Sequence, residues 1–265
     1  MRLFWSFARQ SFQSRAMYRF DFWMEIISVF FSIYAVYWIW NTLFAQSPGS
    51  FEISLAQMTT YAVLGMAMET IFLPWIGPQV YISEQMKHGL LEMDLMKPVD
   101  FQFHLFARNA GETFFRFFLL FIPTLLVSAY FFDFKLPATF LDGAYFLVSV
   151  FFAYMILFGL NFLMGMISIV TINIESISWA YQGVLRFLSG QVVPLWMFPA
   201  SIAGVLAVLP FQSIYYVPIS LYIGELQGVD AVRAIAIQAV WVVVLMGLGR
   251  FVWSRIYSKM MVQGG

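Results

Sequence analysis

The chain has 265 residues, of which 62% are hydrophobic and only 11% charged, and its formal net charge is zero. A soluble domain is about one-quarter charged, so the composition excludes an ordinary soluble protein, and a neutral chain exerts no general attraction on nucleic acid. It contains no cysteine, which excludes disulfides, thiol catalysis and cysteine metal sites. We therefore predict an all-α polytopic membrane protein with a single transmembrane domain over residues 1–265.

The first 20 residues have the pattern of a helix that lies along the membrane surface. Leu3, Phe7 and Phe12 recur at helical spacing, and Arg2 and Arg9 fall on the other side. A basic amphipathic helix binds among anionic headgroups. The alternative is a basic segment that only orients the first span. The apolar run that follows has full length and does not end like a cleavage site, so we expect it to be retained.

Six apolar segments follow, each close to the roughly 20 residues that cross a bilayer. They cover residues 22–44, 57–79, 113–131, 143–168, 176–197 and 231–254. Residues 198–230 are apolar enough for a seventh span, but Pro199, Pro210 and Pro218 divide them into pieces of about ten residues that are too short to cross. We expect an extracellular re-entrant helical hairpin there, which requires protein or water to cover its backbone.

The distribution of basic residues favours six spans over seven. With six, eleven of the fourteen Lys and Arg residues fall on one side, in the N-terminal segment, the loop after the second span and the C-terminal tail. Cytoplasmic loops carry this excess. Both termini are therefore predicted to be cytoplasmic. A seventh span would move Arg250, Arg255 and Lys259 outside.

Polar residues at membrane depth are costly and usually face protein or water. Glu69 lies in the second predicted span, and Arg186 and Gln191 lie in the fifth. A Glu69–Arg186 pair would serve helix packing or line a substrate path. Asn161 in the fourth span, with Gly165 and Ser168, is more typical of helix packing. Glu25 and Arg116, near cytoplasmic span ends, are expected to extend towards the membrane surface.

The segment 82–100 is the most unusual part of the chain because its charged and apolar residues alternate. Ser83, Gly89 and Pro98 can begin, interrupt and end a short helix. We expect an amphipathic helix across the cytoplasmic surface, whose methionines can adapt to a partner's groove. The alternative is a helix that only lies on the membrane. The residues predicted to dock are Glu84, Met86, Leu90, Leu91, Glu92, Met93, Asp94 and Leu95.

No catalytic or metal pattern is visible. The chain has no G-x-x-x-x-G-K-[ST] motif for holding ATP. His88 and His104 are its two histidines, and they are sixteen residues apart. We therefore predict no catalytic residues, no metal ligands and no cofactor in this chain.

Two segments resemble the permease subunits of a bacterial branch of ABC transporters. In ISEQMKHGLLEMDLMKPVDFQFHLFAR (82–108), matches to the pattern of that branch are Gly89, Leu91, Leu95, Pro98 and Val99, while Met86, Glu92 and Lys97 replace Ile, Asp and Arg. In SGQVVPLWMFPASIAGVLAVLPFQSIYYVP (189–218), the matches are Ser189, Gly190, Pro194, Phe198, Pro199, Pro210, Phe211 and Pro218. The resemblance covers nearly the whole chain.

The resemblance implies a six-span exporter subunit in the bacterial inner membrane. Such a subunit has an interfacial elbow helix, here residues 1–20, a cytoplasmic coupling region, here 80–108, and a re-entrant hairpin, here 198–230. It would form a translocation path with a second permease chain, in a homodimer or heterodimer surrounded by membrane lipid. A separate ATPase would dock on the coupling region and bind ATP and Mg²⁺. The alternative is a secondary carrier or channel without an ATPase, which would usually show more ion ligands at the membrane midplane.

Overall fold

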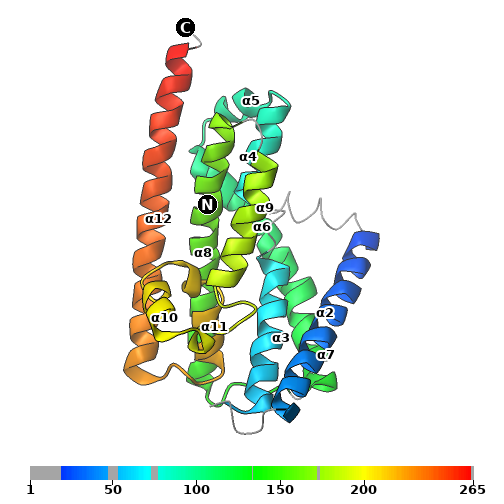
Figure 1. Ribbon diagram of the computed structural model, residues 1–265. Helices are drawn as coiled ribbons and strands as arrows, with labels where there is room; N and C mark the ends of the chain where they lie inside the picture. Colours follow the sequence, from blue (N-terminus) through cyan, green and yellow to red (C-terminus); the bar gives the residue numbers. More distant parts are fainter. Residues whose placement is uncertain (1–18, 47–52, 73–76, 133, 172–173, 264–265) are drawn as a thin grey trace.

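The computed structural model describes residues 19–46, 53–72, 77–132, 134–171 and 174–263. All regular secondary structure in these ranges is helical, as predicted. The segment 1–18, which contains nearly all of the predicted interfacial helix, lies outside the described residues. Figure 1 shows an elongated bundle in which α5 and the end of α12 lie at the same end.

The helices follow one another along the chain with short connections. They are α2 (Arg19–Gln46), α3 (Leu55–Ile71), α4 (Pro78–Lys87), α5 (Leu91–Leu95), α6 (Phe101–Arg116), the π-helical turn η1 (Phe117–Phe121), α7 (Ile122–Phe131), α8 (Phe140–Val170), α9 (Ile174–Leu188), the 3₁₀ turn η2 (Leu195–Met197), α10 (Ala200–Leu206), the 3₁₀ turn η3 (Phe211–Ser213), α11 (Tyr216–Tyr222) and α12 (Gly228–Gln263).

Four stretches of helix in the described residues are long and apolar enough to cross a membrane. They are Trp23–Gln46, Phe101–Phe131, Phe140–Ile169 and Gly228–Ser258. These four agree with the first, third, fourth and sixth predicted spans. The structure thus supports a multi-pass membrane protein, and the count of six spans remains a prediction.

The second and fifth predicted spans form shorter helices than expected. Instead of one helix over 57–79, α3 ends at Ile71 and α4 begins at Pro78. Pro74 and Pro78 lie in this predicted span, and proline disrupts a helix interior. In the fifth, α9 ends at Leu188 instead of near 197. Gly190 follows with a φ of +77°, a left-handed conformation that suits glycine and ends helices.

The third long helix is continuous through α6, η1 and α7 but widens into a π-helical turn at Phe117–Phe121. Pro123 follows this turn within the first residues of α7. A proline cannot donate the usual intrahelical hydrogen bond, and its ring would press on the carbonyl group four residues earlier. The wider turn accommodates Pro123 without breaking the helix.

Helix α8 is the centre of the bundle and packs against α4, α11 and α12. Two glycines let neighbouring helices approach closely. A Cβ atom on Gly159 would lie 2.8 Å from the Cβ of Leu245 in α12, and one on Gly165 would lie 2.5 Å from the Cδ1 of Ile82 in α4. Close approach at small residues is typical of packing in membranes. Gly165 thus has the helix-packing role that was predicted for it together with Asn161 and Ser168.

The proline-rich region before α12 forms two seven-residue helices, α10 and α11, separated by η3. Pro199 precedes the first residue of α10, and Pro210 precedes the first residue of η3. The predicted division is therefore present at Pro199 and Pro210, whereas Pro218 lies within the first turn of α11 and does not interrupt it. The entry of this region into the membrane remains a prediction. The side chain of Gln238 in α12 ties the region to the bundle, donating to the carbonyl oxygen of Ser213 at 2.8 Å.

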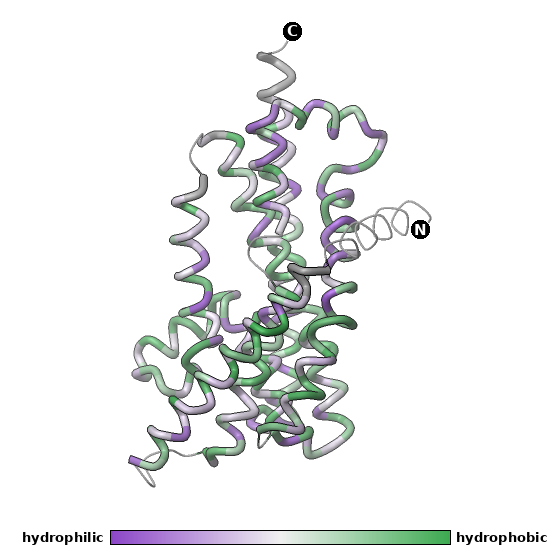
Figure 2. Tube along the Cα trace, turned by 90° about the vertical axis from the view of Figure 1, so that its right-hand side faces the viewer, coloured by the Kyte–Doolittle hydropathy of each residue, from purple (hydrophilic) through white to green (hydrophobic). Residues whose placement is uncertain are grey.

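Polarity is unevenly distributed along the bundle. Figure 2 shows hydrophilic residues concentrated towards the end that carries the C-terminus, and hydrophobic residues along much of the remainder. The same end carries α5, where hydrophilic and hydrophobic residues alternate (Figures 1 and 2). The bundle therefore places the predicted coupling region at a polar tip.

Candidate functional site

The predicted coupling region contains two helices, α4 and α5, separated by a turn at Gly89, the residue expected to interrupt a short helix here. Helix α4 ends at Lys87, and Gly89 follows with a φ of +66°, which suits glycine. The amide of Leu90 donates to the carbonyl oxygen of Gln85 at 2.8 Å across this turn. Helix α5 then ends at Leu95, three residues before Pro98. The Asp100 side chain caps α6 by accepting from the amide of Phe103 at 2.9 Å.

The eight residues predicted to dock on a partner fall into two groups. Leu90 and Met93 are exposed apolar side chains, with 42% and 60% of their surface accessible, and Glu84 and Glu92 are exposed acidic ones. Met96, which follows α5 and was not in the predicted set, is 77% exposed. A row of exposed apolar residues on a polar tip is typical of a protein-binding surface.

The other residues of the predicted set face the chain's own interior. Leu91 is only 4% exposed and packs in a core cluster with Ile82, Phe101 and Trp253. Met86 and Leu95 pack partly against the same cluster. Leu91 therefore anchors α5 to the bundle and does not offer its side chain to a partner. Its predicted docking role was wrong because apolar spacing in the sequence does not distinguish the inner face of a helix from the outer one.

Asp94 is also buried, and it holds α5 against α4. Its carboxylate accepts a hydrogen bond from the Tyr81 hydroxyl at 2.6 Å and pairs with the Lys97 ammonium at 2.6 Å. The Arg108 guanidinium lies 4.0 Å from the centre of the Tyr81 ring. Burial by itself raises the pKa of Asp94, but the bonds from Lys97 and Tyr81 outweigh it and leave the pKa below its ordinary value. We call Tyr81, Asp94 and Lys97 the α5 clamp.

The end of α12 joins the same region through two contacts that the sequence did not indicate. The Arg250 guanidinium lies 3.2 Å from the carboxylate of Asp100. The Trp253 ring stacks on Phe101, with centroids 4.3 Å apart. The residues are about 150 positions apart in sequence, so spacing could not reveal them. A displacement of α5 would therefore reach α4, α6 and α12.

The predicted polar residues of the second and fifth spans do meet. The Arg186 guanidinium donates to Glu69, and the Gln191 amide donates to the other carboxylate oxygen of Glu69 at 2.9 Å. Tyr61, two helical turns before Glu69 on the same face of α3, donates to the carbonyl oxygen of Gly190 at 2.5 Å. One face of α3 thus packs on the segment that ends α9, and Arg186 keeps 44% of its side-chain surface exposed.

Asn161 is not part of this group. Its side-chain oxygen accepts a hydrogen bond from the Tyr181 hydroxyl at 3.0 Å, so it links α8 to α9. Glu69, Arg186 and Gln191 therefore form one polar group, and Asn161 belongs to a second one.

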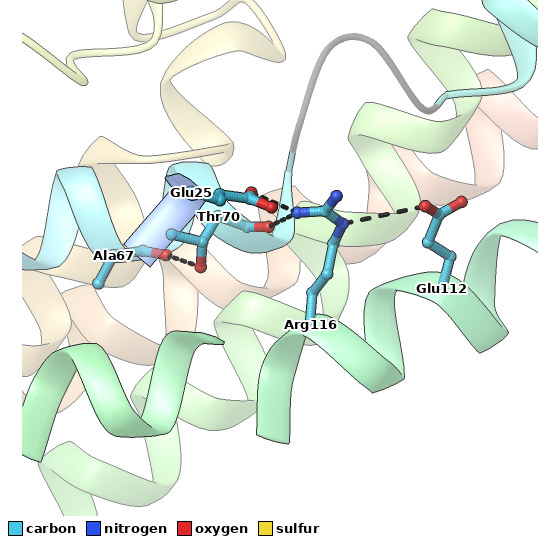
Figure 3. Close-up of polar contacts among 5 residues, drawn as sticks. All are labelled: Glu25, Ala67, Thr70, Glu112 and Arg116. Carbon is cyan, nitrogen blue, oxygen red and sulfur yellow. Dashed lines mark hydrogen bonds and ion pairs between the residues drawn. The ribbon is translucent and has the colours of Figure 1, made fainter. Parts of the chain in front are cut away.

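A third polar group was misread from the sequence. Arg116 was expected to extend to the membrane surface, but it is buried and joins three helices (Figure 3). Its guanidinium donates to Glu25 in α2 at 2.5 Å and to the carbonyl oxygen of Thr70 in α3 at 3.2 Å, and it lies 3.9 Å from Glu112. The i, i+4 spacing of Glu112 and Arg116 was the signal that could have indicated a paired arginine.

Arg116 also stabilises the end of α3. The last carbonyl groups of a helix lack intrahelical partners and carry partial negative charge. A buried guanidinium bonded to the Thr70 carbonyl group satisfies one of them (Figure 3). The same side chain thus fixes the position of α2 and the C-terminal end of α3.

A comparison against protein families identifies the family of this chain. Residues 26–264 match the model of the ABC-2 family transporter proteins. None of the curated proteins matches the chain. The matched range contains α3 to α12, including the α5 clamp and the group around Glu69. The chain therefore belongs to the ABC-2 family of transporter proteins, and it is a multi-pass membrane permease component of an ABC transporter.

Proposed function

We propose that this chain is the permease subunit of an ATP-driven exporter and that α5 is its docking site for a separate ATPase. The observation that carries the proposal is the row of exposed apolar residues on α5 and just after it, at the polar tip of a chain from the ABC-2 family. ATP and Mg²⁺ would bind to the ATPase. A second permease chain would complete the translocation path.

The contact would be made by Leu90, Met93 and Met96. Unbranched methionine side chains fit irregular grooves. Exposed Glu84 and Glu92 would orient the partner by charge. Leu91 and the α5 clamp lie behind this surface and would transmit its movement to the bundle.

We further propose six spans with both termini in the cytoplasm of a bacterial inner membrane. In this arrangement α3 and α4 together make the second span, and α9 is the fifth. The basic residues near α5 and at the end of α12 support this orientation, because they lie at one end of the bundle. Helices α10 and α11 would be the re-entrant hairpin on the opposite side.

The docking proposal is tested with Met93→Asp in the chain co-expressed with its ATPase. An apolar side chain buried at an interface is worth about 1.5–3 kcal/mol, so a charge there should weaken co-purification roughly tenfold or more. Glu92→Gln should have a smaller effect, since charges at the rim of an interface contribute mainly to steering.

The matched control is Leu136→Asp, which places the same charge on a side chain that is 77% exposed between α7 and α8, away from α5. It should leave co-purification unchanged. Full retention of the ATPase by correctly inserted Met93→Asp would remove α5 as the docking site. If the chain transports without any ATPase, it is the secondary carrier or channel considered above.

A further inference from the structure

An open cleft lies between the proline-rich region and the first turns of α12, towards the end of the bundle opposite α5 (Figure 1). Its polar wall includes Ser213 and Tyr216 on one side and Asp230 and Arg233 on the other. The volume of the cleft is about 180 Å³. Sites that enclose a whole small ligand occupy roughly 300–1,000 Å³, so this cleft suits the head of a molecule whose remaining part lies outside.

The cleft presents one negative and one positive side chain. Asp230 and Arg233 are both exposed and lie three residues apart near the start of α12. In the part of the chain that the structure describes, neither side chain forms an ion pair or a hydrogen bond. The neighbouring Glu225 is already bonded, because its carboxylate accepts from the hydroxyl groups of Tyr216 and Ser220, each at 3.1 Å. Asp230 and Arg233 are therefore the charges available to a ligand.

The hydroxyl group of Ser213 is a further unsatisfied group at this wall. Ser213 is only 1% exposed, and its hydroxyl group has no hydrogen-bond partner among the described residues. The bond from Gln238 to its carbonyl oxygen fixes the backbone of the residue. Buried polar groups in native structures nearly always have a partner. An oxygen atom of a ligand in the cleft would provide one.

The surroundings of the cleft indicate the class of ligand. Arg233 and Ile237 line it. Val240 and Val244, which are 61% and 46% exposed, continue the same row along α12 at spacings of three and four residues. Because Gly228–Ser258 is long and apolar enough to span a membrane, the charges lie near one end of the span and the exposed apolar row runs into it. A charged end followed by an apolar row matches the order of a phospholipid.

We propose that this cleft binds the headgroup of one phospholipid, with the phosphate on Arg233 and Ser213 and the ammonium group of a zwitterionic headgroup on Asp230. Guanidinium groups bind phosphate through paired, charge-assisted hydrogen bonds. A carboxylate beside them favours a headgroup that also carries a positive charge over a purely anionic one. The acyl chains would lie along Val240 and Val244 and add little preference, since lipid tails elsewhere are equally apolar. The lipid would hold the proline-rich region against α12.

This inference does not depend on how the chain docks with an ATPase. The leaflet from which the lipid comes rests on the proposed topology, which places this end of the bundle outside. Retention of the lipid does not depend on the leaflet, so a wrong topology and a wrong lipid site give different results.

Lipid retention by the full-length chain tests the proposal. The chain is reconstituted in vesicles of equal parts phosphatidylethanolamine and phosphatidylglycerol with identical acyl chains, extracted again in mild detergent and weighed by native mass spectrometry. We expect one retained phosphatidylethanolamine per chain, preferred over phosphatidylglycerol about twofold to fivefold, the range for an exposed charge pair. Arg233→Ala should lower retention about tenfold, because the charge-assisted hydrogen bonds to the phosphate are lost.

Three further variants separate the two charges from a general effect. Asp230→Asn should abolish the preference for phosphatidylethanolamine without lowering the total retained lipid. Arg233→Lys keeps the charge but loses the paired geometry, so its retention should be intermediate. Arg255→Ala removes an exposed arginine towards the far end of the same helix and is the matched control. It should leave the retained phosphatidylethanolamine unchanged.

Equal retention by Arg233→Ala and the unmodified chain would overturn the proposal, as would an equal loss in Arg255→Ala. An unchanged headgroup preference in Asp230→Asn would overturn the assignment of the ammonium group. Displacement of the lipid by an equal concentration of soluble glycerophosphoethanolamine would show that the cleft takes a soluble zwitterion and not a lipid. If Arg233→Ala does not insert, Arg233→Lys and Asp230→Asn decide the question.

Discussion

At the residue scale, the informative side chains are charges whose partners come from other helices. Arg116 is such a residue, and a buried charge of this kind needs its partners. Removing one partner from a buried ion pair destabilises a protein by about 3–5 kcal/mol. Its contacts with Glu25 and the Thr70 carbonyl group provide the compensation that burial requires. Asp94 follows the same logic at the polar tip, where its partners are Tyr81 and Lys97.

Asp94→Asn should loosen α5 without unfolding the chain. The substitution keeps an acceptor for the Tyr81 hydroxyl but loses the ion pair with Lys97. Amide hydrogen exchange in α5 should accelerate about threefold to tenfold, a modest change because Lys97 is 41% exposed and the pair is partly screened. Glu92→Gln, an exposed carboxylate in the same helix, is the control and should leave exchange unchanged. Equal exchange in Asp94→Asn and the unmodified chain would show that the clamp does not hold α5.

The clamp should also weaken in acid. Because the pKa of Asp94 is lowered on folding, its contribution is complete above the ordinary value of 3.8 and is lost as the pH falls below it. After correction for intrinsic exchange rates, α5 in the unmodified chain should approach the behaviour of Asp94→Asn in this acidic range. If the unmodified chain and Asp94→Asn differ in exchange protection by the same factor at every pH, the assignment to Asp94 is contradicted.

At the element scale, the predicted pair of Glu69 and Arg186 lies where α3 packs against the end of α9. Tyr61, Gly65 and Glu69 are spaced by four residues and share one face of α3. A Cβ atom on Gly65 would lie 3.0 Å from the carbonyl oxygen of Gln191, so the two segments approach as closely as glycine permits. Glu69 then reaches Arg186 and Gln191. The pair thus fixes α3 relative to α9, whichever role the exposed part of Arg186 has.

A double-mutant cycle measures this pair. Glu69→Gln should lower the stability of the folded chain, and adding Arg186→Gln should partly restore it, with a coupling energy of about 0.5–1 kcal/mol because Arg186 is partly exposed. Additive effects would show that the pair contributes no coupling. If Glu69 also lines the translocation path, Glu69→Gln should change transport by more than the loss of folded protein explains.

At the scale of the whole molecule, one end of the bundle is polar and carries α5 and the end of α12 (Figures 1 and 2). Arg250 and Trp253 connect α12 to the start of α6 there. Because α8 packs on both α4 and α12, movement at this end can pass along several helices at once. This arrangement suits a subunit driven from one side of the membrane.

The topology can be tested with single cysteines, because the chain has none of its own. Cysteines replacing Ala138 or Gln227 should react with an impermeant thiol reagent added outside intact cells. Cysteines replacing Lys87 or Lys259 should react only after the membrane is permeabilised. Labelling from outside at Lys259 would favour seven spans over six.

The sequence by itself determined the class of this protein. Long apolar runs require helices in a membrane. The prolines at 199, 210 and 218 rule out a long uninterrupted helix between α9 and α12. The motifs in 82–108 and 189–218 indicated the ABC permease family, which the match over residues 26–264 confirmed. These properties are local, so composition, spacing and helix-breaking residues are enough to show them.

Only the tertiary structure decided which side of each helix faces the protein. Leu91 and Met93 are alike in the sequence, but packing against Trp253 buries the first and leaves the second exposed. Arg116, near a span end, is buried by partners in α2 and α3. Burial depends on neighbours that are distant in the chain, and in a membrane protein the lipid-facing and inner faces are both apolar. Hydrophobic pattern therefore cannot separate them, whereas packing can.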